Sequence, residues 1–324
     1  MRVAVLGATG AVGRELMGVL ERRSFPVREL FALASSRSAG KTLPFGGGEV
    51  EVQDAEGFDL SVCDMVFCCV GSDTARRFVP RAIESGCFVV DNSSAYRMQP
   101  DVPLVVPEIN GDEVRPPLVA NPNCTTAITL VALAPLHRRW RMRRLIAATY
   151  QAASGAGSAA ISELLSHTDA ALKGTKPKSC VFPHSIAFNL FPHIGDFVGS
   201  YTTEELKLEQ ETRKILNEAD ISVSAFCVRV PVVRAHSVAA FVCFDEQPDQ
   251  KEAEQLIRQS SGVELHIPYP TPLDAEGKDA VLVGRIRSDA ALERALSLWI
   301  VGDQLLKGAA LNAVQIGEKL LEVI

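Results

Sequence analysis

The chain has 324 residues, of which 47% are hydrophobic and 22% are charged, and its formal net charge is −6. This composition is typical of a soluble globular protein rather than a disordered or fibrous one, and a chain of this length usually forms more than one domain. The acidic balance and the lack of a long lysine or arginine run argue against nucleic acid or an acidic membrane surface as a partner.

The cysteine content and the start of the sequence indicate a reducing compartment. The eight cysteines form no CxxC pair and no zinc-type spacing with histidine, and a chain of this size needs no disulfide bonds to fold. A strand is expected by residue 3, which leaves no room for a signal sequence. No apolar run approaches the roughly 20 residues of a membrane span. We therefore expect a cytoplasmic protein without a membrane partner.

The first part of the chain alternates apolar runs with turns and helical periodicity. The run VAVLG leads into the glycines of GATGAVG, and apolar residues then recur at helical spacing from Arg14 to Arg22. Three further apolar runs end in turn residues: ELFALAS at 29–35, MVFCCVG at 65–71 and GCFVVDNS at 86–93. We expect buried parallel strands in a doubly wound sheet. The glycines Gly7, Gly10 and Gly13 would let a pyrophosphate approach a helix N-terminus.

The segment after the second expected strand indicates which dinucleotide would bind. Folds specific for NAD usually place an Asp or Glu there to bind the ribose hydroxyls, but ALASSRSAGK contains no carboxylate. Ser35, Ser36, Arg37 and Ser38 would instead donate hydrogen bonds to a 2′-phosphate. The segment favours NADP over NAD, and the alternative is an ordinary solvated loop.

Cys124 differs from the other seven cysteines in its context. Those seven lie in or beside expected strands and are interpreted as small core residues: Cys63, Cys68, Cys69, Cys87, Cys180, Cys227 and Cys243. Cys124 precedes TTAITLVALAPL, which predicts a buried helix with the cysteine in its first turn. A helix N-terminus stabilises a thiolate, and lowering the thiol pKa by about 1.5 units would leave it roughly half ionised at pH 7. Cys124 is either a nucleophile or core packing.

The second part of the chain supplies polar residues at the ends of expected elements. LIAATYQAASGAGSAAISELL predicts a strand that ends at Gln151, then a glycine turn and a helix. YTTEELKLEQETRKIL predicts an amphipathic helix with Thr203 as N-cap and with Glu204 and Lys207 on one face. The alternative for this helix is a surface element without a functional role.

Charged residues also interrupt two apolar, strand-like runs in AFCVRVPVVRAHSVAAFVCF. Arg229, Arg234 and His236 lie there. Burying a charge without a partner costs free energy, so charged residues in such runs indicate a functional or structural role. By contrast, His184 and His193 are nine residues apart without supporting carboxylates or cysteines. We interpret these two as structural and expect no metal.

Eight motifs, in order and over nearly the whole chain, resemble those of aspartate-β-semialdehyde dehydrogenases. They are GATGAVG, SSRSAG, VDNSSAYRM, NPNCTT, TYQAASGAG, EELKLEQETRKIL, RVPVVRAHS and VGDQLLKGAALNAVQI. One departure is Ala235, where many relatives have glycine. The resemblance implies an α/β protein with a Rossmann-type NADP-binding domain at 1–123 and 305–324. It also implies an α+β catalytic and dimerisation domain at 124–304.

The resemblance further implies a reaction and a set of residues that carry it out. The family uses NADPH to convert L-aspartyl-4-phosphate to L-aspartate-4-semialdehyde and phosphate through a cysteine thioester, on the route to lysine, threonine and methionine. The implied roles are Cys124 as nucleophile, His236 as acid and base, Gln151, Glu204 and Arg229 for the substrate, and Arg97 and Lys207 for phosphate. The implied NADP(H) contacts are Gly7, Thr9, Gly10, Ala11, Val12, Arg37, Ser38, Ser154, Gly155 and Gln304.

The expected partners are small molecules and a second copy of the chain, as a homodimer or a homotetramer. The alternatives are a related thioester-forming reductase of the N-acetylglutamyl-phosphate or glyceraldehyde-3-phosphate type, or a catalytically silent NADP-binding paralogue. Retention of the whole set of expected catalytic residues argues against the silent paralogue.

Overall fold

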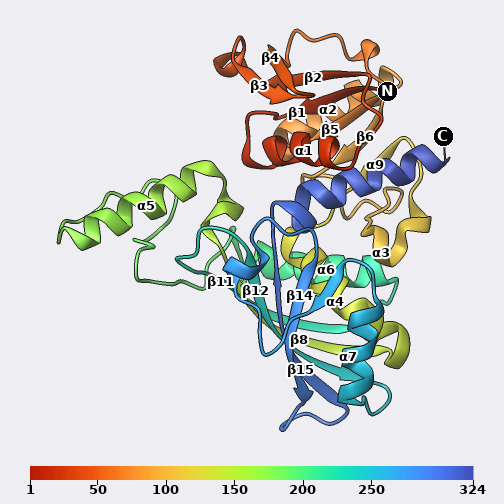
Figure 1. Cartoon of the computed structure of the whole chain (residues 1–324), viewed down its shortest axis with the longest axis vertical. Helices are drawn as coiled ribbons and strands as arrows, with labels where there is room; N and C mark the ends of the chain where they lie inside the picture. The colour runs from red at the N-terminus through yellow and green to blue at the C-terminus, as the bar shows by residue number, and fades with distance from the viewer. Residues whose placement is uncertain (324) are drawn as a thin grey trace. The chain divides into compact units, whose positions relative to one another are not determined.

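The computed structural model describes residues 1–323, which fold into two compact units (Figure 1). The first unit comprises Met1–Asn123 and the chain from Ala309 onward, and the second comprises Cys124–Gly308. The sequence predicts that the chain returns to the first domain at residue 305, whereas in the structure the first unit resumes at Ala309.

The first unit is built on a seven-stranded sheet of order β3-β4-β2-β1-β5-β6-β7. Its strands are β1 (Arg2–Leu6), β2 (Glu29–Ala34), β3 (Thr42–Phe45), β4 (Gly48–Asp54), β5 (Met65–Cys68), β6 (Phe88–Asp91) and β7 (Leu118–Ala120). All neighbouring strands are parallel except β3 and β4. The apolar runs that predicted buried parallel strands correspond to β1, β2, β5 and β6, which confirms the expected α/β fold.

The C-terminal helix belongs to this first unit. Its helices are α1 (Ala11–Arg22), α2 (Ser72–Glu84), α3 (Pro107–Asn110) and α9 (Leu311–Val323). Helix α9 packs against α1, α3 and β6. Arg23 donates to both carboxylate oxygens of Glu318 at 2.7 Å, and Asn312 donates to the Val105 carbonyl at 2.9 Å. A Cβ on Gly317 would lie 2.8 Å from the Phe67 ring, so α9 packs closely on the core.

The order of the strands reverses at β1, which places a ligand-binding point there. The chain runs from β1 to β2 on one side, and β5 lies on the other side. Doubly wound sheets bind ligands beyond the carboxyl ends of their strands at such a point. Glycine is required in the loop after β1, because a Cβ on Gly7 (φ +88°) would lie 2.4 Å from the Cys69 carbonyl oxygen. A Cβ on Gly13 would lie 2.3 Å from the Gly7 oxygen.

The second unit contains a mixed six-stranded sheet of order β11-β8-β12-β15-β14-β13. The strands are β8 (Met142–Gln151), β11 (Ser222–Arg229), β12 (His236–Phe244), β13 (Val263–Leu265), β14 (Val281–Ser288) and β15 (Ala295–Gly302), with a small hairpin of β9 (Phe197–Val198) and β10 (Tyr201–Thr202). The β11–β8 and β13–β14 pairs are parallel, and the other pairs are antiparallel. A mixed sheet with helices against it makes this unit α+β, as expected.

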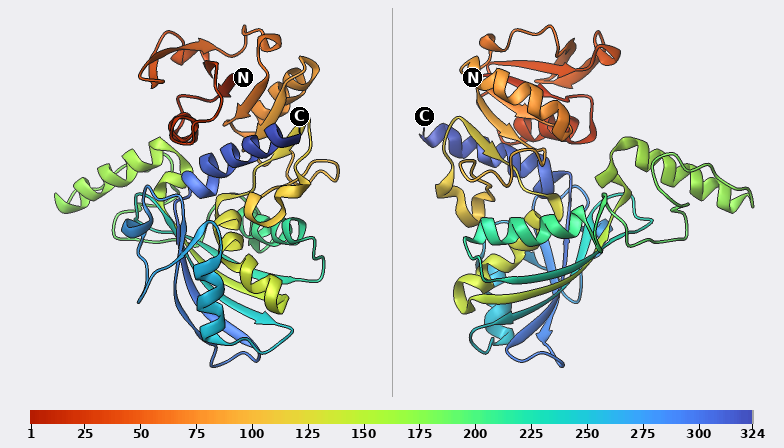
Figure 2. Two further views of the ribbon diagram at one scale, coloured as in Figure 1. Left: turned by 45° about the vertical axis from the view of Figure 1, so that its right-hand side comes forward. Right: turned by 180° about the vertical axis from the view of Figure 1, so that it is seen from behind.

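The helices of this unit are α4 (Cys124–Trp140), α5 (Ser158–Leu172), α6 (Thr203–Leu216), α7 (Gln250–Gln259) and α8 (Pro272–Ala275). Helices α4, α6 and α7 pack on one face of the sheet, whereas α5 extends away from it (Figure 1). On the other face the short α8 packs at β14 and β15, where Ala275 clusters with Leu282 and Val301, and the part over β8 and β11 is open (Figure 2). On the open face Phe226 is 70% exposed and Ile146 is 36% exposed. A protein rarely leaves such a face uncovered in its working state.

Short helical turns complete the two units. They are Ser36–Ser38, Leu60–Val62, Gly111–Glu113, Ala153–Ala156 and a π-helical turn at Leu306–Ala310. Among residues 1–323, no helix is long and apolar enough to cross a membrane.

Two local predictions are wrong. The N-cap of α6 is Thr202 rather than Thr203, because Thr202 and Glu205 form a reciprocal capping box. Cys180 is exposed rather than part of the core. It lies in the irregular segment after α5, where its backbone N–H is held at 2.9 Å by the buried carboxylate of Glu163 while its side chain faces solvent. All eight cysteines are free thiols.

Candidate active site

In the first unit, the glycine loop leads directly into the N-terminus of α1. Gly10 is the N-cap, no side chain caps it within the described chain, and the first turn contains no acidic residue. Ala11 and Val12 begin the helix, and the Thr9 carbonyl accepts a hydrogen bond from Arg14 at 3.1 Å. A helix N-terminus of this kind attracts an anion because its first N–H groups and the helix dipole point outward.

The short turn after β2 presents a basic and hydroxyl-bearing surface. Arg37 is exposed and Ser38 is half-buried in the turn Ser36–Ser38. Since this turn follows the carboxyl end of β2, it lies at the same edge of the sheet as the glycine loop after β1. The edge therefore combines a helix N-terminus with an exposed cation.

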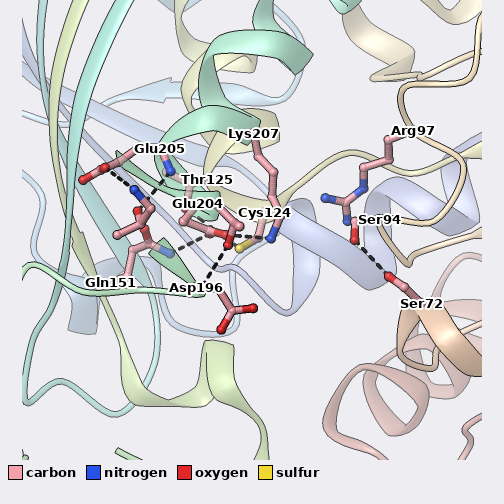
Figure 3. A network of polar contacts seen from close by, with 12 residues as sticks. Ser72, Ser94, Arg97, Cys124, Thr125, Gln151, Asp196, Glu204, Glu205 and Lys207 are labelled. Carbon is pink, nitrogen blue, oxygen red and sulfur yellow. Dashed lines mark hydrogen bonds and ion pairs between the residues drawn. The ribbon is translucent and has the colours of Figure 1, made fainter. Parts of the chain in front are cut away.

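Arg97 is anchored within the first unit by backbone oxygens. Its Nε donates to the Asn121 carbonyl and its Nη2 donates to the Asn92 carbonyl, each at 2.9 Å. Nearby in the same unit, the hydroxyls of Ser72 and Ser94 lie 2.9 Å apart (Figure 3). These carbonyl partners fix the orientation of the guanidinium, the group that proteins most often use to bind an anion at two points.

In the second unit, Cys124 is the first residue of α4, as predicted. Its sulfur lies 3.9 Å from the Thr125 hydroxyl oxygen. Gly308 packs so closely that a Cβ there would lie 2.8 Å from the Cys124 Cβ. The thiol therefore lies at a helix N-terminus, and close packing against Gly308 restricts the position of the cysteine side chain.

A chain of hydrogen bonds links three of the predicted site residues (Figure 3). Gln151 donates from Nε2 to Glu204 Oε1 at 3.1 Å, and Lys207 donates to Glu204 Oε2 at 3.2 Å. Thr149, which the sequence analysis did not single out, fixes the amide orientation by donating to Gln151 Oε1 at 2.9 Å. The end of β8 and the first turn of α6 are thereby held together.

Arg229 is a buried guanidinium without a carboxylate partner among residues 1–323. Its Nη1 donates to the carbonyls of Gln151 and Ala152, and it lies over the Phe182 ring with its Cζ 5.8 Å from the ring centroid. Burial lowers the pKa of Arg229, and the negative charge of Glu204 raises it. Arginine nevertheless stays protonated in proteins, so this buried cation is suited to bind an anion.

His236 is fully buried at the start of β12, and its tautomer follows from its contacts. The Ala152 N–H donates to Nδ1 at 3.1 Å, so the ring proton of the neutral imidazole lies on Nε2. Nε2 itself has no hydrogen-bond partner in the described chain. Burial, and then the charge of Arg229, lower the pKa of His236 to about 3. The ring is therefore neutral at pH 7 and presents an unused donor.

The remaining predicted residues lie on the turn after β8 and at the end of β15. Ser154 and Gly155 form part of the turn Ala153–Ala156, and a Cβ on Gly155 would lie 3.2 Å from the His236 ring. Gln304 is buried in the second unit, where its Nε2 donates to the Ser154 hydroxyl and its Oε1 accepts from the Ala235 N–H.

His184 and His193, which the sequence predicts to be structural, each contact a phenylalanine ring. His184 lies edge-on to Phe191, whereas His193 stacks on Phe197 with ring centroids 4.5 Å apart. In residues 1–323 no cluster of three His, Cys, Asp or Glu side chains could hold a metal ion.

The fold and this geometry define a class of protein. A dinucleotide-type sheet is joined to an α+β unit in which a cysteine begins a buried helix, and in which a neutral histidine and an arginine without a carboxylate partner in residues 1–323 are buried. Comparisons with known proteins make the class specific. Residues 2–116 match the family model described as "Semialdehyde dehydrogenase, NAD binding domain", and residues 133–307 match "Semialdehyde dehydrogenase, dimerisation domain".

Individual relatives agree over the full length. The chain is 47% identical to an aspartate-semialdehyde dehydrogenase of a Synechocystis strain, over 99% of this chain and 98% of that protein. It resembles the crystal structure of aspartate semialdehyde dehydrogenase II from Vibrio cholerae complexed with ASA, with a TM-score of 0.97, 43% identity, and 99% and 98% of the two chains covered. A Candida albicans enzyme solved with NADP has a TM-score of 0.79 and 28% identity, with 100% and 99% covered. The chain belongs to the aspartate-semialdehyde dehydrogenase family and is an oxidoreductase of this type.

Proposed function

We propose that the protein converts L-aspartyl-4-phosphate and NADPH to L-aspartate-4-semialdehyde, phosphate and NADP+. The observation that carries this proposal is the buried Arg229, which has no carboxylate partner in the described chain and belongs to the same unit as Cys124. A substrate with a carboxylate at one end and a reactive acyl group at the other would engage both.

The proposed chemistry begins at the Cys124 sulfur. The helix N-terminus would favour the thiolate, which attacks the acyl carbon, so that a C–S bond forms and the bond to phosphate breaks. When bound, NADPH would supply the hydride that reduces the resulting thioester. The neutral His236 would donate a hydrogen bond from Nε2–H to the oxygen that becomes negative, because Nδ1 already accepts a hydrogen bond. Collapse of this tetrahedral thiohemiacetal anion would then break the C–S bond, release the aldehyde and return the Cys124 thiolate.

The two ends of the substrate require different partners. Arg229 would hold the α-carboxylate as a two-point pair, and Glu204, with Gln151 beside it, would hold the ammonium. Arg97 and Lys207 would bind the phosphate and stabilise the charge of the leaving group. Lys207 can do so only by sharing its ammonium with Glu204, to which it is already paired at 3.2 Å.

NADP is the proposed cofactor, and the first unit with α9 is proposed as its binding domain. Its residues fit the cofactor: in the described chain no side chain caps the N-terminus of α1 and its first turn has no acidic residue, which suits a pyrophosphate, and the turn after β2 contains no carboxylate to repel a 2′-phosphate. The proposed contacts are Gly7, Thr9, Gly10, Ala11, Val12, Arg37 and Ser38, with Ser154, Gly155 and Gln304 from the second unit.

The second unit is proposed to carry catalysis and self-association in a cytoplasmic enzyme. Its open sheet face carries the exposed Phe226 and Ile146, together with a hollow of about 450 Å³ lined in part by Tyr269 and Trp299. A second copy of the chain would cover this face in a homodimer, two of which could form a tetramer. The eight free thiols support a reducing compartment.

Arg37→Ala should raise KM for NADPH by about tenfold or more and leave KM for NADH nearly unchanged. The reason is the loss of one charge-assisted contact to the 2′-phosphate, worth about 1.5 kcal/mol or more. Steady-state kinetics with both cofactors measures the difference. Arg28→Ala is the matched control, because Arg28 is also exposed but precedes the amino end of β2. Equal effects of Arg37→Ala on both cofactors would show that Arg37 has only a structural role.

The direct test of the function is the reverse reaction. The protein should reduce NADP+ when supplied with L-aspartate-4-semialdehyde, and the rate should depend on inorganic phosphate. Activity with N-acetylglutamate semialdehyde or glyceraldehyde 3-phosphate in its place would indicate a related thioester-forming dehydrogenase. NADP+ binding without turnover of any of these aldehydes would indicate a silent paralogue.

A further inference from the structure

The carboxylate of Asp303, directly after β15, organises three separate stretches of the second unit. The side chain is fully buried, and the family resemblance gives it no role in the site, although its last motif includes Asp303. It accepts hydrogen bonds from Arg234 Nε at 2.7 Å, Gly277 N at 2.8 Å, Leu305 N at 2.9 Å and Leu306 N at 3.3 Å. A buried carboxylate with this many donors is a strong local constraint, because removing its charge leaves several donors unsatisfied.

One of these stretches supports the nucleophile. The Asp303 carbonyl accepts from the Gly308 N–H at 3.1 Å, and its carboxylate holds the residues in between. Gly308 in turn lies against Cys124, where an added Cβ would be 2.8 Å from the cysteine Cβ. The turn that Asp303 organises is therefore the surface on which Cys124 rests.

A second stretch contains a strained residue next to the histidine. Ala235 has a φ of +70°, in the left-handed region that non-glycine residues rarely adopt because the Cβ crowds the following carbonyl oxygen. It is held there on both sides: the preceding Arg234 is paired with Asp303, and the Ala235 N–H donates to Gln304 Oε1 at 2.8 Å. The following residue is His236, which pairs with Gly302 of β15.

The other end of the Gln304 amide reaches the turn that faces the histidine ring. Its Nε2 donates to the Ser154 hydroxyl, next to Gly155, which packs on the ring. The same turn follows Ala152, whose N–H fixes the tautomer of His236. Both functional ends of this side chain are thus engaged by the protein, which distinguishes Gln304 from a residue that only contacts a cofactor.

We propose that Asp303 and Gln304 are positioning residues that hold the Ala235 backbone in its left-handed conformation and so set the placement of His236 relative to Cys124. The inference rests on the proposed function for the roles of the histidine and the cysteine. Asp303 acts through its contacts with Arg234 and Gly308. Gln304 acts through its contacts with Ala235 and Ser154. Neither of the two touches a reacting group itself.

The test combines Asp303→Asn with Ala235→Gly. Asp303→Asn keeps the size of the side chain but puts an NH2 against its donors, and it should lower kcat at least tenfold with KM for NADP+ within about twofold. Glycine adopts a positive φ freely, so Ala235→Gly should change kcat less than about twofold alone. In the Asp303→Asn background it should restore kcat about fivefold or more, a coupling that a double-mutant cycle measures.

A matched control separates positioning from stability. Asp289→Asn alters another carboxylate that caps a loop, since Asp289 accepts from the N–H groups of Ala291 and Leu292 and from the Ser297 hydroxyl, and it should leave kcat unchanged. If Asp303→Asn does not fold, Arg234→Met breaks the same ion pair from its more exposed side and should show the same rescue. Equal effects of Ala235→Gly in both backgrounds would overturn the proposal, as would a rise in KM for NADP+ with kcat unchanged.

A substrate-free measurement distinguishes this inference from the proposed function. Alkylation of Cys124 by iodoacetamide, quantified by peptide mass spectrometry at pH 7, should be at least fivefold slower in Asp303→Asn. An inactive wild-type protein would overturn the proposed function, yet the alkylation rates would still report whether Asp303 positions Cys124. Unchanged alkylation together with unchanged kcat would show that Asp303 only stabilises the fold.

Discussion

Replacing Cys124 with serine should reduce turnover by at least a thousandfold while leaving the affinity for NADPH within about twofold. Serine preserves the shape of the side chain, but its hydroxyl is a far weaker nucleophile than a thiolate favoured by a helix N-terminus, so the thioester does not form. The proposed NADPH contacts lie mainly in the glycine loop and the turn after β2, which the substitution does not alter. Steady-state turnover and fluorescence titration with NADPH measure the two quantities separately.

The exposed Cys180 requires its own control in this experiment. Iodoacetate will label that thiol in any variant that keeps it, so total labelling does not identify the nucleophile. Cys180→Ser should remain fully active and should still be inactivated by iodoacetate. The double variant with Cys124→Ser should take up almost no label under native conditions, because the other thiols are buried or half-buried. Residual activity of Cys124→Ser that iodoacetate still abolishes would assign the nucleophile to another cysteine.

Arg229→Lys should lower kcat/KM for L-aspartate-4-semialdehyde by about a hundredfold or more, even though the positive charge is retained. The guanidinium is held in one orientation by the Gln151 and Ala152 carbonyls, and the planar fork can meet both oxygens of a carboxylate. A lysine ammonium offers a single point charge and cannot reproduce that geometry. The loss should appear in the aldehyde kinetics, with KM for phosphate nearly unchanged.

Arg97→Lys should give the opposite pattern and so serves as the comparison. It should raise KM for phosphate in the reverse reaction and affect the aldehyde less, because Arg97 is proposed to bind the leaving group. Arg143→Lys is the neutral control, since Arg143 forms an ion pair with Asp245 that is 40% exposed at both side chains. If Arg229→Lys perturbed only phosphate, or Arg97→Lys only the aldehyde, the assignment of the two substrate ends would be reversed.

Local patterns in the sequence are sufficient to predict the elements whose stability depends on residues close in the chain. The apolar runs of β1, β2, β5 and β6 and the buried helix that begins at Cys124 were predicted correctly, because burial on a regular element imposes a regular periodicity. The N-cap of α6 was misplaced by one residue. Thr202 and Thr203 are both good caps, and the choice depends on which of them lies three residues before a glutamate that returns the hydrogen bond.

The residue types and their order along the chain indicate which chemistry is available: one cysteine at a helix start, a glycine loop without a following carboxylate, and arginines and a histidine in apolar strands. How these groups are held depends on contacts between segments that are distant in the sequence. The Ala152 N–H selects the tautomer of His236, and Gln304 reaches Ser154 across 150 residues of chain. Asp303 joins Arg234 to the turn beneath Cys124. Such contacts leave no local signal, because a backbone N–H is common to nearly every residue and a hydrogen bond between distant segments depends on how strands and loops pack.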